Sequence, residues 1–357
     1  MSPNFVAPPN GVATGYAITD PKDYLNFQKT EYKLEPLEDD RVTVAVECCG
    51  VCGSDHHTIT GGWGSWETKF VVTGHEVVGR VVELGKNVTQ FQIGQRVGVG
   101  AQVGSCGTCK WCKNDNENYC PEPVHGYNTL WPDKSEHQGG YSTHIRAQEL
   151  FVFPLPEEIP SVEAASMLCG GLTTYSPLVR NNIGPGSKVG VVGLGGLGHY
   201  AVLFGVALGA EVTVFSRSDA KKADALKMGA TRFVATTPGF EKDLFREFDL
   251  IICAASGTNL PIDEYLTTLD VGKKFVFVGL PDEGLKEVKS QALIWGVGLS
   301  GSHIGCRTEA LSMLKLAAEK KIKPWINVIP MAQAADAIKS IEDGSVRYRT
   351  ILTTDLL

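Results

Sequence analysis

The feature that most constrains the fold is a glycine-rich turn between an apolar strand and an apolar helix. Residues 189–192, Val-Gly-Val-Val, are typical of a buried strand, and residues 199–208 have helical composition. The turn between them has the spacing Gly-x-Gly-x-x-Gly, which permits close approach of a pyrophosphate to backbone N–H groups at a helix N-terminus. In this strand–turn–helix setting the motif predicts a dinucleotide site formed by Gly193, Leu194, Gly195, Gly196, Leu197 and Gly198.

The sequence around this turn alternates short apolar runs with helical stretches. We expect strands over residues 188–192, 211–215, 233–235, 250–253 and 274–278. Such alternation is typical of a parallel sheet covered by helices on both faces. We therefore expect an α/β domain with a doubly wound, Rossmann-type parallel sheet over residues 161–307.

The first third of the chain instead has β-branched segments divided by glycines, which indicate an antiparallel, barrel-like domain. Strands are expected over 41–47, 77–84, 96–101 and 141–146. Near the other end, helical stretches at 309–320 and 332–342 precede a last strand at 347–352. A terminal strand needs a sheet to join. We therefore group residues 308–357 with residues 1–160 in one domain and treat 161–307 as an insertion.

Charge and hydropathy limit the possible partners. The 357 residues include 33 Lys and Arg against 40 Asp and Glu, a formal net charge of −7, and contain no basic run. This balance argues against a nucleic-acid or anionic-membrane partner and favours a small-molecule one. The first residues lack the charge and apolar pattern of a secretory signal, and no apolar stretch is long enough to span a membrane. We expect a cytoplasmic protein with no membrane association.

A cluster of cysteines follows the pattern C-x2-C-x2-C-x7-C. Two-residue gaps allow one tight turn to present successive sulfurs to a single tetrahedral ion, so the spacing favours a closed zinc site with a structural role. An iron–sulfur cluster is the alternative, although that type of run continues C-x3-C-Pro and the last gap here is longer. Free thiols are the other alternative. The expected ligands are Cys106, Cys109, Cys112 and Cys120.

A second set of metal-binding side chains is scattered along the sequence. Cys52 lies in Gly-Val-Cys-Gly-Ser-Asp, His75 and Glu76 lie in Gly-His-Glu-Val-Val-Gly, and Cys169 precedes two glycines. Two thiolates and one imidazole leave a tetrahedral zinc one open position, which is the pattern of a catalytic ion. Glu76 is suited to occupy that position in the absence of substrate. A surface His-Glu pair and an ordinary core cysteine are the alternatives that the residues alone leave open.

These motifs together resemble the zinc-containing medium-chain alcohol dehydrogenases. The family's zinc signature is similar to Gly74-His-Glu-x2-Gly79-x5-Gly85-x2-Val88, and it occurs here in the same order as the cysteine lobe and the glycine turn. The resemblance covers nearly the whole chain and implies a GroES-like barrel-type catalytic domain with an inserted Rossmann domain. Similarity to the cinnamyl-alcohol-dehydrogenase branch is carried by residues 48–55, 95–100, 138–141, 169–176 and 346–349.

The resemblance also assigns roles to individual residues. It implies that Cys52, His75 and Cys169 bind a catalytic zinc, that Glu76 is an exchangeable ligand, and that each chain holds two Zn²⁺. Ser54 matches the hydroxyl that hydrogen-bonds the substrate oxygen, His57 the outer end of a proton relay through the cofactor ribose, and Asp55 a carboxylate that orients the zinc-bound histidine. The same comparison places Thr173, Ser300 and Ser302 at the cofactor.

The choice between NAD and NADP is made at the tip of the second strand of the nucleotide-binding domain. An acid there binds the ribose 2′-OH of NAD and repels a 2′-phosphate. This strand ends instead in Ser216, Arg217 and Ser218, with Lys221 nearby. A hydroxyl beside a guanidinium can hydrogen-bond and neutralise a phosphate, so NADP(H) is the expected cofactor. Asp219 is the counter-indication, but its position fits the first turn of the next helix.

Zinc and nicotinamide together make hydride transfer the economical reaction: reversible interconversion of an aldehyde and an alcohol. The substrate class is an aromatic, cinnamaldehyde-like or a medium-chain aldehyde. Reduction of a conjugated carbon–carbon double bond is the alternative on the same scaffold, although Ser54 is retained. Zinc-free quinone reductases and non-catalytic homologues also have this architecture, but the chain keeps all the expected ligands.

Four aromatic residues, Trp63, Trp66, Tyr127 and Trp131, lie near the predicted ligands and are either a substrate pocket or ordinary packing. His303 departs from the branch pattern near the nicotinamide. The family resemblance implies that the glycine-broken apolar run 292–299 forms an edge strand that pairs across a two-fold axis, and therefore a homodimer. An internal strand is the alternative.

Overall fold

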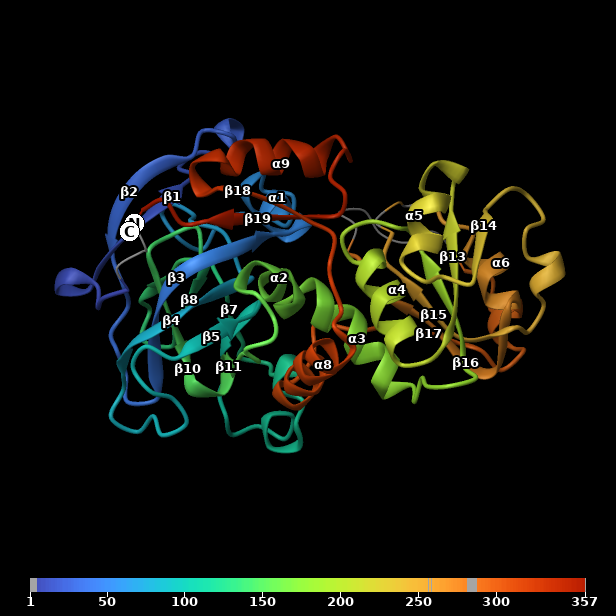
Figure 1. The fold of residues 1–357 in the computed structure, drawn as a ribbon, viewed down its shortest axis with the longest axis horizontal. Helices are drawn as coiled ribbons and strands as arrows, with labels where there is room; N and C mark the ends of the chain where they lie inside the picture. The colour runs from blue at the N-terminus through green and yellow to red at the C-terminus, as the bar shows by residue number, and fades with distance from the viewer. Residues whose placement is uncertain (1–4, 256, 258, 281–287, 357) are drawn as a thin grey trace. The chain divides into compact units, whose positions relative to one another are not determined.

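The computed structural model describes residues 5–255, 257, 259–280 and 288–356. The chain divides into two compact units. The first unit consists of Met1–Cys169 and Cys306–Leu357, and the second consists of Gly170–Gly305. Figure 1 shows the chain entering the second unit through its green and yellow segments and returning to the first unit in red.

The first unit is built on a mixed sheet of seven strands. Its strands run in the order β11-β5-β4-β3-β19-β18, and β10 also pairs with β3. Their bounds are β3 (Arg41–Val51), β4 (Val77–Leu84), β5 (Arg96–Val99), β10 (His144–Gln148), β11 (Val152–Pro154), β18 (Ile326–Pro330) and β19 (Arg349–Thr353). The chain's last strand therefore joins the sheet formed by its first third.

The long strand β3 pairs with three other strands of this unit. Residues 41–45 pair with β10, residues 48–51 pair with β19, and β4 lies along the other side. The strand's apolar side chains, with Val42, Val44 and Val46 fully buried, belong to one continuous core cluster. Immediately after β3, Cys52 begins the short helix α1 (Gly53–Ile59).

Smaller elements complete the first unit. Two further helices are α8 (Arg307–Lys320) and α9 (Ala334–Glu342), and Figure 1 shows both in red. The others are β1 (Val12–Ala17), β2 (Gln28–Lys33), β6 (Gln102–Gly104), β7 (Val124–His125), β8 (Thr129–Leu130), β9 (Glu136–His137) and α2 (Ser161–Ala165). Single 3-10 turns are η1 (Pro9–Gly11), η2 (Pro21–Asp23), η3 (Cys112–Asn114), η4 (Glu117–Tyr119), η5 (Glu149–Phe151), η6 (Ser166–Leu168) and η9 (Met331–Gln333).

The second unit contains a six-stranded parallel sheet in the order β14-β13-β12-β15-β16-β17. This is the strand order of a doubly wound nucleotide-binding fold. The strands are β12 (Lys188–Val192), β13 (Glu211–Ser216), β14 (Arg232–Ala235), β15 (Phe248–Cys253), β16 (Leu269–Phe277) and β17 (Gly298–Gly301). The helices are α3 (Gly170–Arg180), α4 (Gly198–Ala207), α5 (Lys222–Lys227), α6 (Ile262–Thr267) and α7 (Ser290–Leu293), with turns η7 (Asp219–Lys221) and η8 (Lys242–Leu244).

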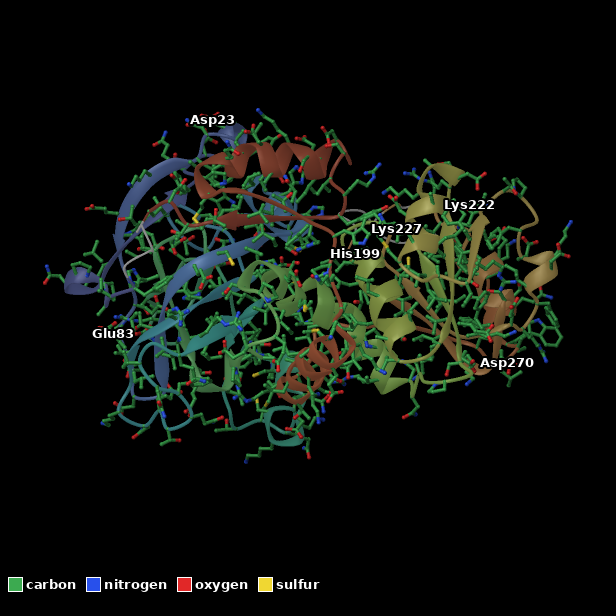
Figure 2. The ribbon with its side chains drawn as sticks, viewed as in Figure 1. Asp23, Glu83, His199, Lys222, Lys227 and Asp270 are labelled. Atoms are coloured by element: carbon green, nitrogen blue, oxygen red, sulfur yellow. The ribbon has the colours of Figure 1, made fainter. Side chains whose placement is uncertain are left out.

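Aromatic packing holds the core of the second unit together. Phe215 of β13 is fully buried, and its ring centroid lies 5.3 Å from that of Tyr265 and 5.5 Å from that of Phe248, in edge-to-face arrangements. Burial of one such side chain contributes about 1.5–3 kcal/mol. Lys222, Lys227 and Asp270, which are labelled in Figure 2, are exposed charged residues of this unit.

The α/β and barrel-type fold class expected from the sequence is confirmed. The compact units place residues 161–169 in the first unit, because α2 packs against β3 and β4. They also assign residues 306 and 307 to that unit. The bounds of the expected catalytic domain, 1–160 with 308–357, and of the expected nucleotide-binding domain, 161–307, stay a prediction. Within the described residues, every helix is too short or too polar to cross a membrane.

Candidate metal centres and nucleotide loop

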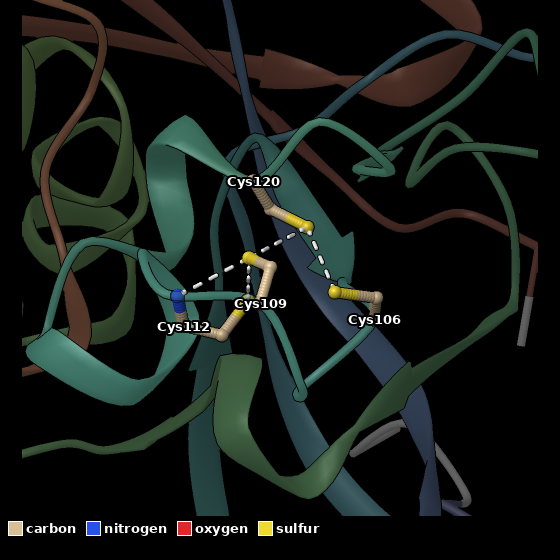
Figure 3. Close-up of side chains that lie close together, drawn as sticks. All are labelled: Cys106, Cys109, Cys112 and Cys120. Carbon is tan, nitrogen blue, oxygen red and sulfur yellow. Dashed lines mark hydrogen bonds between the residues drawn. The ribbon is translucent and has the colours of Figure 1, made fainter.

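The cysteine cluster lies in a lobe of the first unit between β6 and β7. Its four sulfurs lie within 4.8 Å of one another, with Sγ–Sγ distances of 3.5 Å from Cys109 to Cys112 and from Cys120 to Cys106, and 4.0 Å from Cys109 to Cys120 (Figure 3). Sulfurs bound tetrahedrally at about 2.3 Å from one zinc lie about 3.8 Å apart. None of the four forms a disulfide. The lobe therefore fits a four-thiolate zinc.

The electrostatics of this lobe also suit a cation. Backbone N–H groups of Thr108 and Cys109 lower the pKa of Cys106 to about 6. Burial raises the pKa of Cys112 to about 12. Four sulfurs this close cannot all become thiolates without a positive charge among them, and a divalent ion supplies it.

The second set of ligands comes together from three segments of the first unit. Cys52 follows β3, His75 and Glu76 precede β4, and Cys169 follows η6. One ligand atom from each of these four residues lies within 4.8 Å of the others. Each side chain is buried, and His75 Nε2 lies 3.2 Å from Cys169 Sγ. The donor set fits a zinc with two thiolates, one imidazole and a position that Glu76 or a substrate oxygen can take.

Shifts in pKa show how strongly these groups interact. A hydrogen bond with Cys169 lowers the pKa of Cys52 well below its usual value, and the same bond raises the pKa of Cys169. Burial acts to lower the pKa of His75, but Cys52 and Asp55 outweigh burial and raise it to about 9. Burial raises the pKa of Glu76 to about 7, although Arg349 opposes this. Such shifts are typical of functional sites.

Asp55 anchors the backbone around these ligands. The N–H of Cys52 donates to Asp55 Oδ2 at 2.8 Å, and the N–H of Gly74 donates to Oδ1 at 3.1 Å. The Tyr141 hydroxyl donates to Oδ2 at 2.9 Å. Cys52 and Asp55 also cap α1 reciprocally. Asp55 Oδ1 lies 3.6 Å from His75 Nδ1, so the carboxylate lies beside the histidine that the family resemblance expects it to orient.

Arg349, for which the sequence predicts no role, contacts the candidate metal centre. It lies on β19, is 4% exposed, and its guanidinium forms an ion pair with the buried Glu76 carboxylate. Gly50 makes room for this carboxylate, because a Cβ there would lie 2.0 Å from Glu76 Oε2. Arg349 ends the segment 346–349 that carried the branch resemblance, so a signal for it was present in the sequence.

The expected relay residues lie together on α1. Ser54 Oγ lies 3.7 Å from Cys52 Sγ. His57 follows three residues later, and its ring stacks on Trp63 with centroids 4.9 Å apart and planes 13° apart.

Only one of the four aromatic residues near the ligands is exposed. Trp63 is 45% exposed. The other three are packed: Trp66 Nε1 donates to the Thr58 carbonyl, Trp131 Nε1 donates to Glu35, and the Tyr127 hydroxyl lies against His75 Nδ1.

The glycine turn of the second unit has the geometry that a pyrophosphate needs. Gly193 has a φ of +88°, and a Cβ on Gly198 would lie 1.9 Å from the Gly193 carbonyl oxygen, whereas nothing lies within 4 Å of a Cβ on Gly195. Glycine is therefore required at Gly193 and Gly198, and the backbone at Gly195 is open to a ligand. At the tip of β13, Ser216 is half-buried and Arg217 is exposed.

Other expected cofactor residues also lie in this unit. Lys221 Nζ donates to the Leu194 carbonyl at 2.7 Å, which links the two parts of the nucleotide site. Thr173 is buried on α3, and Ser300 lies on β17. The Ser302 hydroxyl is buried with no hydrogen-bond partner among the described residues, and an orphaned polar atom of this kind fits a missing ligand. His303 is exposed beside it, and Ser218 is exposed beyond β13.

Comparisons with known proteins identify the family of the chain. Residues 38–157 match the family described as the alcohol dehydrogenase GroES-like domain, and residues 196–319 match the zinc-binding dehydrogenase family. An NADP-dependent alcohol dehydrogenase 6 from Saccharomyces cerevisiae is 45% identical over 345 residues, 95% of each chain.

Solved structures give the same result. A cinnamyl alcohol dehydrogenase from Sorghum bicolor superposes with a TM-score of 0.91 at 35% identity, over 97% of this chain and 99% of that one. A Helicobacter pylori enzyme of the same type, complexed with NADP(H), has a TM-score of 0.88 at 33% identity, over 98% and 99% of the two chains. With both metal-ligand sets and the glycine turn in place, the chain belongs to the zinc-binding alcohol dehydrogenase family.

Proposed function

We propose that this protein is a reversible NADP(H)-dependent alcohol dehydrogenase that reduces aromatic, cinnamaldehyde-like or medium-chain aldehydes. The observation that carries the proposal is the convergence of Cys52, His75 and Cys169, from three distant segments, around one buried point. Two thiolates and one imidazole are the ligands of a catalytic zinc with an open position. The four-cysteine lobe holds a second zinc, which is closed by its ligands and stabilises the fold.

The chain's own residues supply the proton and the orientation for this reaction. When bound, zinc supplies a Lewis acid for the carbonyl oxygen, and the reduced nicotinamide supplies a hydride for the carbonyl carbon. The oxygen then needs one proton, and the Ser54 hydroxyl beside Cys52 is placed to donate it. His57, on the same helix, would hold the proton that restores the Ser54 hydroxyl. Asp55 holds the ligand segments, and Arg349 holds Glu76, the exchangeable ligand.

The direct test is a screen of aldehydes with NADPH and with NADH, using the zinc-loaded protein. We expect cinnamaldehyde and benzaldehyde to be reduced with NADPH, and the alcohol products to be oxidised with NADP. The product of cinnamaldehyde separates the two reactions that this scaffold supports: an unsaturated alcohol supports the proposal, and a saturated aldehyde indicates reduction of the conjugated double bond. Absence of turnover on every aldehyde with both nucleotides would overturn the proposal.

NADP selectivity rests on Arg217 beside Ser216 at the tip of β13. A charge-assisted hydrogen bond to the 2′-phosphate contributes about 1.5–3 kcal/mol. Arg217→Ala is therefore expected to raise KM for NADPH by about 10- to 100-fold while KM for NADH stays unchanged. Lys242→Ala, which removes another exposed positive charge of the second unit outside the motif, is the control. Equal effects on both nucleotides would refute the assignment.

We further propose a cytoplasmic homodimer. β17 is the last strand of the parallel sheet, and no described strand pairs with its outer side. Ile294 and Trp295, just before it, are 78% and 62% exposed. An exposed edge flanked by apolar side chains favours pairing with a second copy. Sedimentation should give a dimer that Trp295→Lys weakens, whereas a monomeric wild-type protein would contradict this part of the proposal. Cell fractionation tests the location.

A further inference from the structure

The two ring nitrogens of His75 face different neighbours. Nε2 faces the other ligands, 3.2 Å from Cys169 Sγ, whereas Nδ1 lies 3.2 Å from the Tyr127 hydroxyl and 3.6 Å from Asp55 Oδ1. A histidine that binds zinc through Nε2 carries its proton on Nδ1 and donates it to an acceptor that fixes the ring. The longer distance exceeds that of a hydrogen bond and the shorter does not. The acceptor is therefore the hydroxyl of Tyr127.

The Tyr127 hydroxyl can accept a hydrogen bond from His75 and donate its own proton to a further acceptor. A phenol accepts one hydrogen bond and still has its own proton to donate. Burial raises the pKa of Tyr127, and the negative charge of Asp55 raises it further, because this carboxylate lies on the same side of the His75 ring. The Asp55 carboxylate is fixed in turn by the backbone N–H groups of Cys52 and Gly74. These contacts form a series that leads from His75 to Tyr127 and then to Asp55.

The position of Tyr127 is set by close packing. Its side chain is 8% exposed, and its ring centroid lies 5.4 Å from that of His75. The preceding Gly126 allows this approach, because a Cβ there would lie 2.8 Å from the Cβ of His75. The N–H of Gly126 also donates to the Ala101 carbonyl at 2.9 Å. The segment after β7 is therefore held directly against the ligand.

We propose that Tyr127 is a positioning residue of the reactive metal centre: its hydroxyl orients the imidazole of His75, and Asp55 acts on that imidazole mainly through Tyr127. The inference rests on the proposed zinc site and adds a residue to it. On this inference Tyr127 does not line the substrate pocket, because its hydroxyl faces the imidazole of His75.

Tyr127→Phe tests the inference by removing a single oxygen. Loss of such an outer contact weakens metal binding by about 10- to 100-fold. We expect the zinc at Cys52, His75 and Cys169 to be lost at correspondingly lower chelator concentration. The zinc of the four-cysteine lobe should stay bound and report that the variant is folded. Tyr265→Phe, which removes a buried hydroxyl of the second unit, is the matched control and should bind both ions like the wild type.

A second measurement asks whether Tyr127 and Asp55 act in series. The zinc dissociation constants of Tyr127→Phe, Asp55→Asn and the double variant are compared, together with the visible spectrum of the cobalt-substituted site. If the series holds, the double variant binds zinc no more weakly than the weaker single variant, and Tyr127→Phe changes the cobalt spectrum. Multiplying effects in the double variant, or a Tyr127→Phe protein with wild-type affinity and spectrum, would overturn the inference.

The wild-type protein distinguishes failure of this inference from failure of the proposed function. A wild type that binds two zinc ions and reduces aldehydes, beside an indistinguishable Tyr127→Phe, refutes only the role of Tyr127. A wild type that holds no zinc at Cys52, His75 and Cys169 refutes the proposed function, and the role of Tyr127 with it.

Discussion

Cys169 lies where η6 ends and the backbone leaves the helical path, with φ −123° and ψ −69°. This turn brings its thiol to within 3.2 Å of His75 Nε2, although the two residues are 94 positions apart. A hydrogen bond with Cys52, followed by burial, raises the pKa of Cys169. A divalent ion bound to both sulfurs takes the place of the proton that they share.

Cys169→Ser removes one ligand with little change in volume. We expect metal analysis to find one zinc per chain, held by the four-cysteine lobe, and aldehyde reduction to fall by more than about 100-fold. Cys253→Ser is the control, because Cys253 is equally buried on β15 but belongs to neither ligand set. A Cys169→Ser protein that still holds two zinc ions would show that this thiol is not a ligand.

His144 on β10 makes folding sensitive to acid. The residue is 3% exposed, and its ring nitrogens contact the Val6 carbonyl and the Thr143 hydroxyl at 2.8 and 2.9 Å. Burial lowers the pKa of His144 below 6.5, aided by Arg146 and opposed by Val6 and Glu83. Below pH 6.5 the unfolded chain therefore takes up a proton that the folded chain does not, and stability falls as the pH falls.

His144→Gln isolates this contribution. The free energy of unfolding in urea is measured for wild type and variant between pH 7.5 and 5.5. Wild type should lose up to about 1.4 kcal/mol more per pH unit below 6.5 than the variant, which has no group to titrate there. Other titrating groups, including the metal ligands, are common to both proteins and cancel in the difference. Parallel pH curves would contradict the expected effect of burial.

Among the elements, the sequence predicts those that local pattern defines. The bounds of β4 and β12 agree with the expected ranges 77–84 and 188–192, because β-branched residues fill both strands. β3 is longer than expected, since it continues through Cys48, Cys49 and Gly50. Gly50 has weak strand preference, and β19 pairs with residues 48–51 from the other end of the chain. Local preference cannot reveal a partner that arrives three hundred residues later.

The turn after α1 is an element with a direct link to the proposed relay. The N–H of Gly62 donates to the His57 carbonyl at 2.8 Å, and that of Gly61 donates to Thr58 at 3.1 Å. Gly61 and Gly64 both adopt positive φ, which bends the segment back over the helix. This path places Trp63 on the ring of His57.

Replacing Trp63 therefore tests whether the turn orients the relay. A stacked aromatic pair contributes about 0.5–1.5 kcal/mol, so Trp63→Ala should lower kcat by about 2- to 10-fold. Trp63→Phe, which can still stack, should recover most of that loss, and zinc content should stay at two ions in both. Equal kcat values for the alanine and phenylalanine variants would show that stacking on His57 does not affect proton transfer.

At the scale of the whole molecule, the motifs predicted the metal ligands but not everything that supports them. Cys52, His75 and Cys169 could be grouped because each lies in a distinctive glycine-containing segment, and the family resemblance linked those segments. Arg349 and Tyr127 reach the site only through tertiary structure: β19 pairs with β3, and the chain after β7 packs on His75. Both residues lie in segments that the sequence singled out, but their roles depend on these long-range contacts and could be assigned only with the fold.

Aldehyde reduction is expected to depend on a zinc held by three residues of the first unit. The test measures NADPH-dependent reduction of cinnamaldehyde by the wild-type protein in three states. The first is the protein as purified, the second is the protein after a chelator has removed its more weakly held zinc, and the third is the protein after zinc has been restored. We predict two zinc ions per chain at the start, loss of activity when one is removed, and recovery of activity with its return. Undiminished turnover by the protein depleted of that zinc would contradict the account.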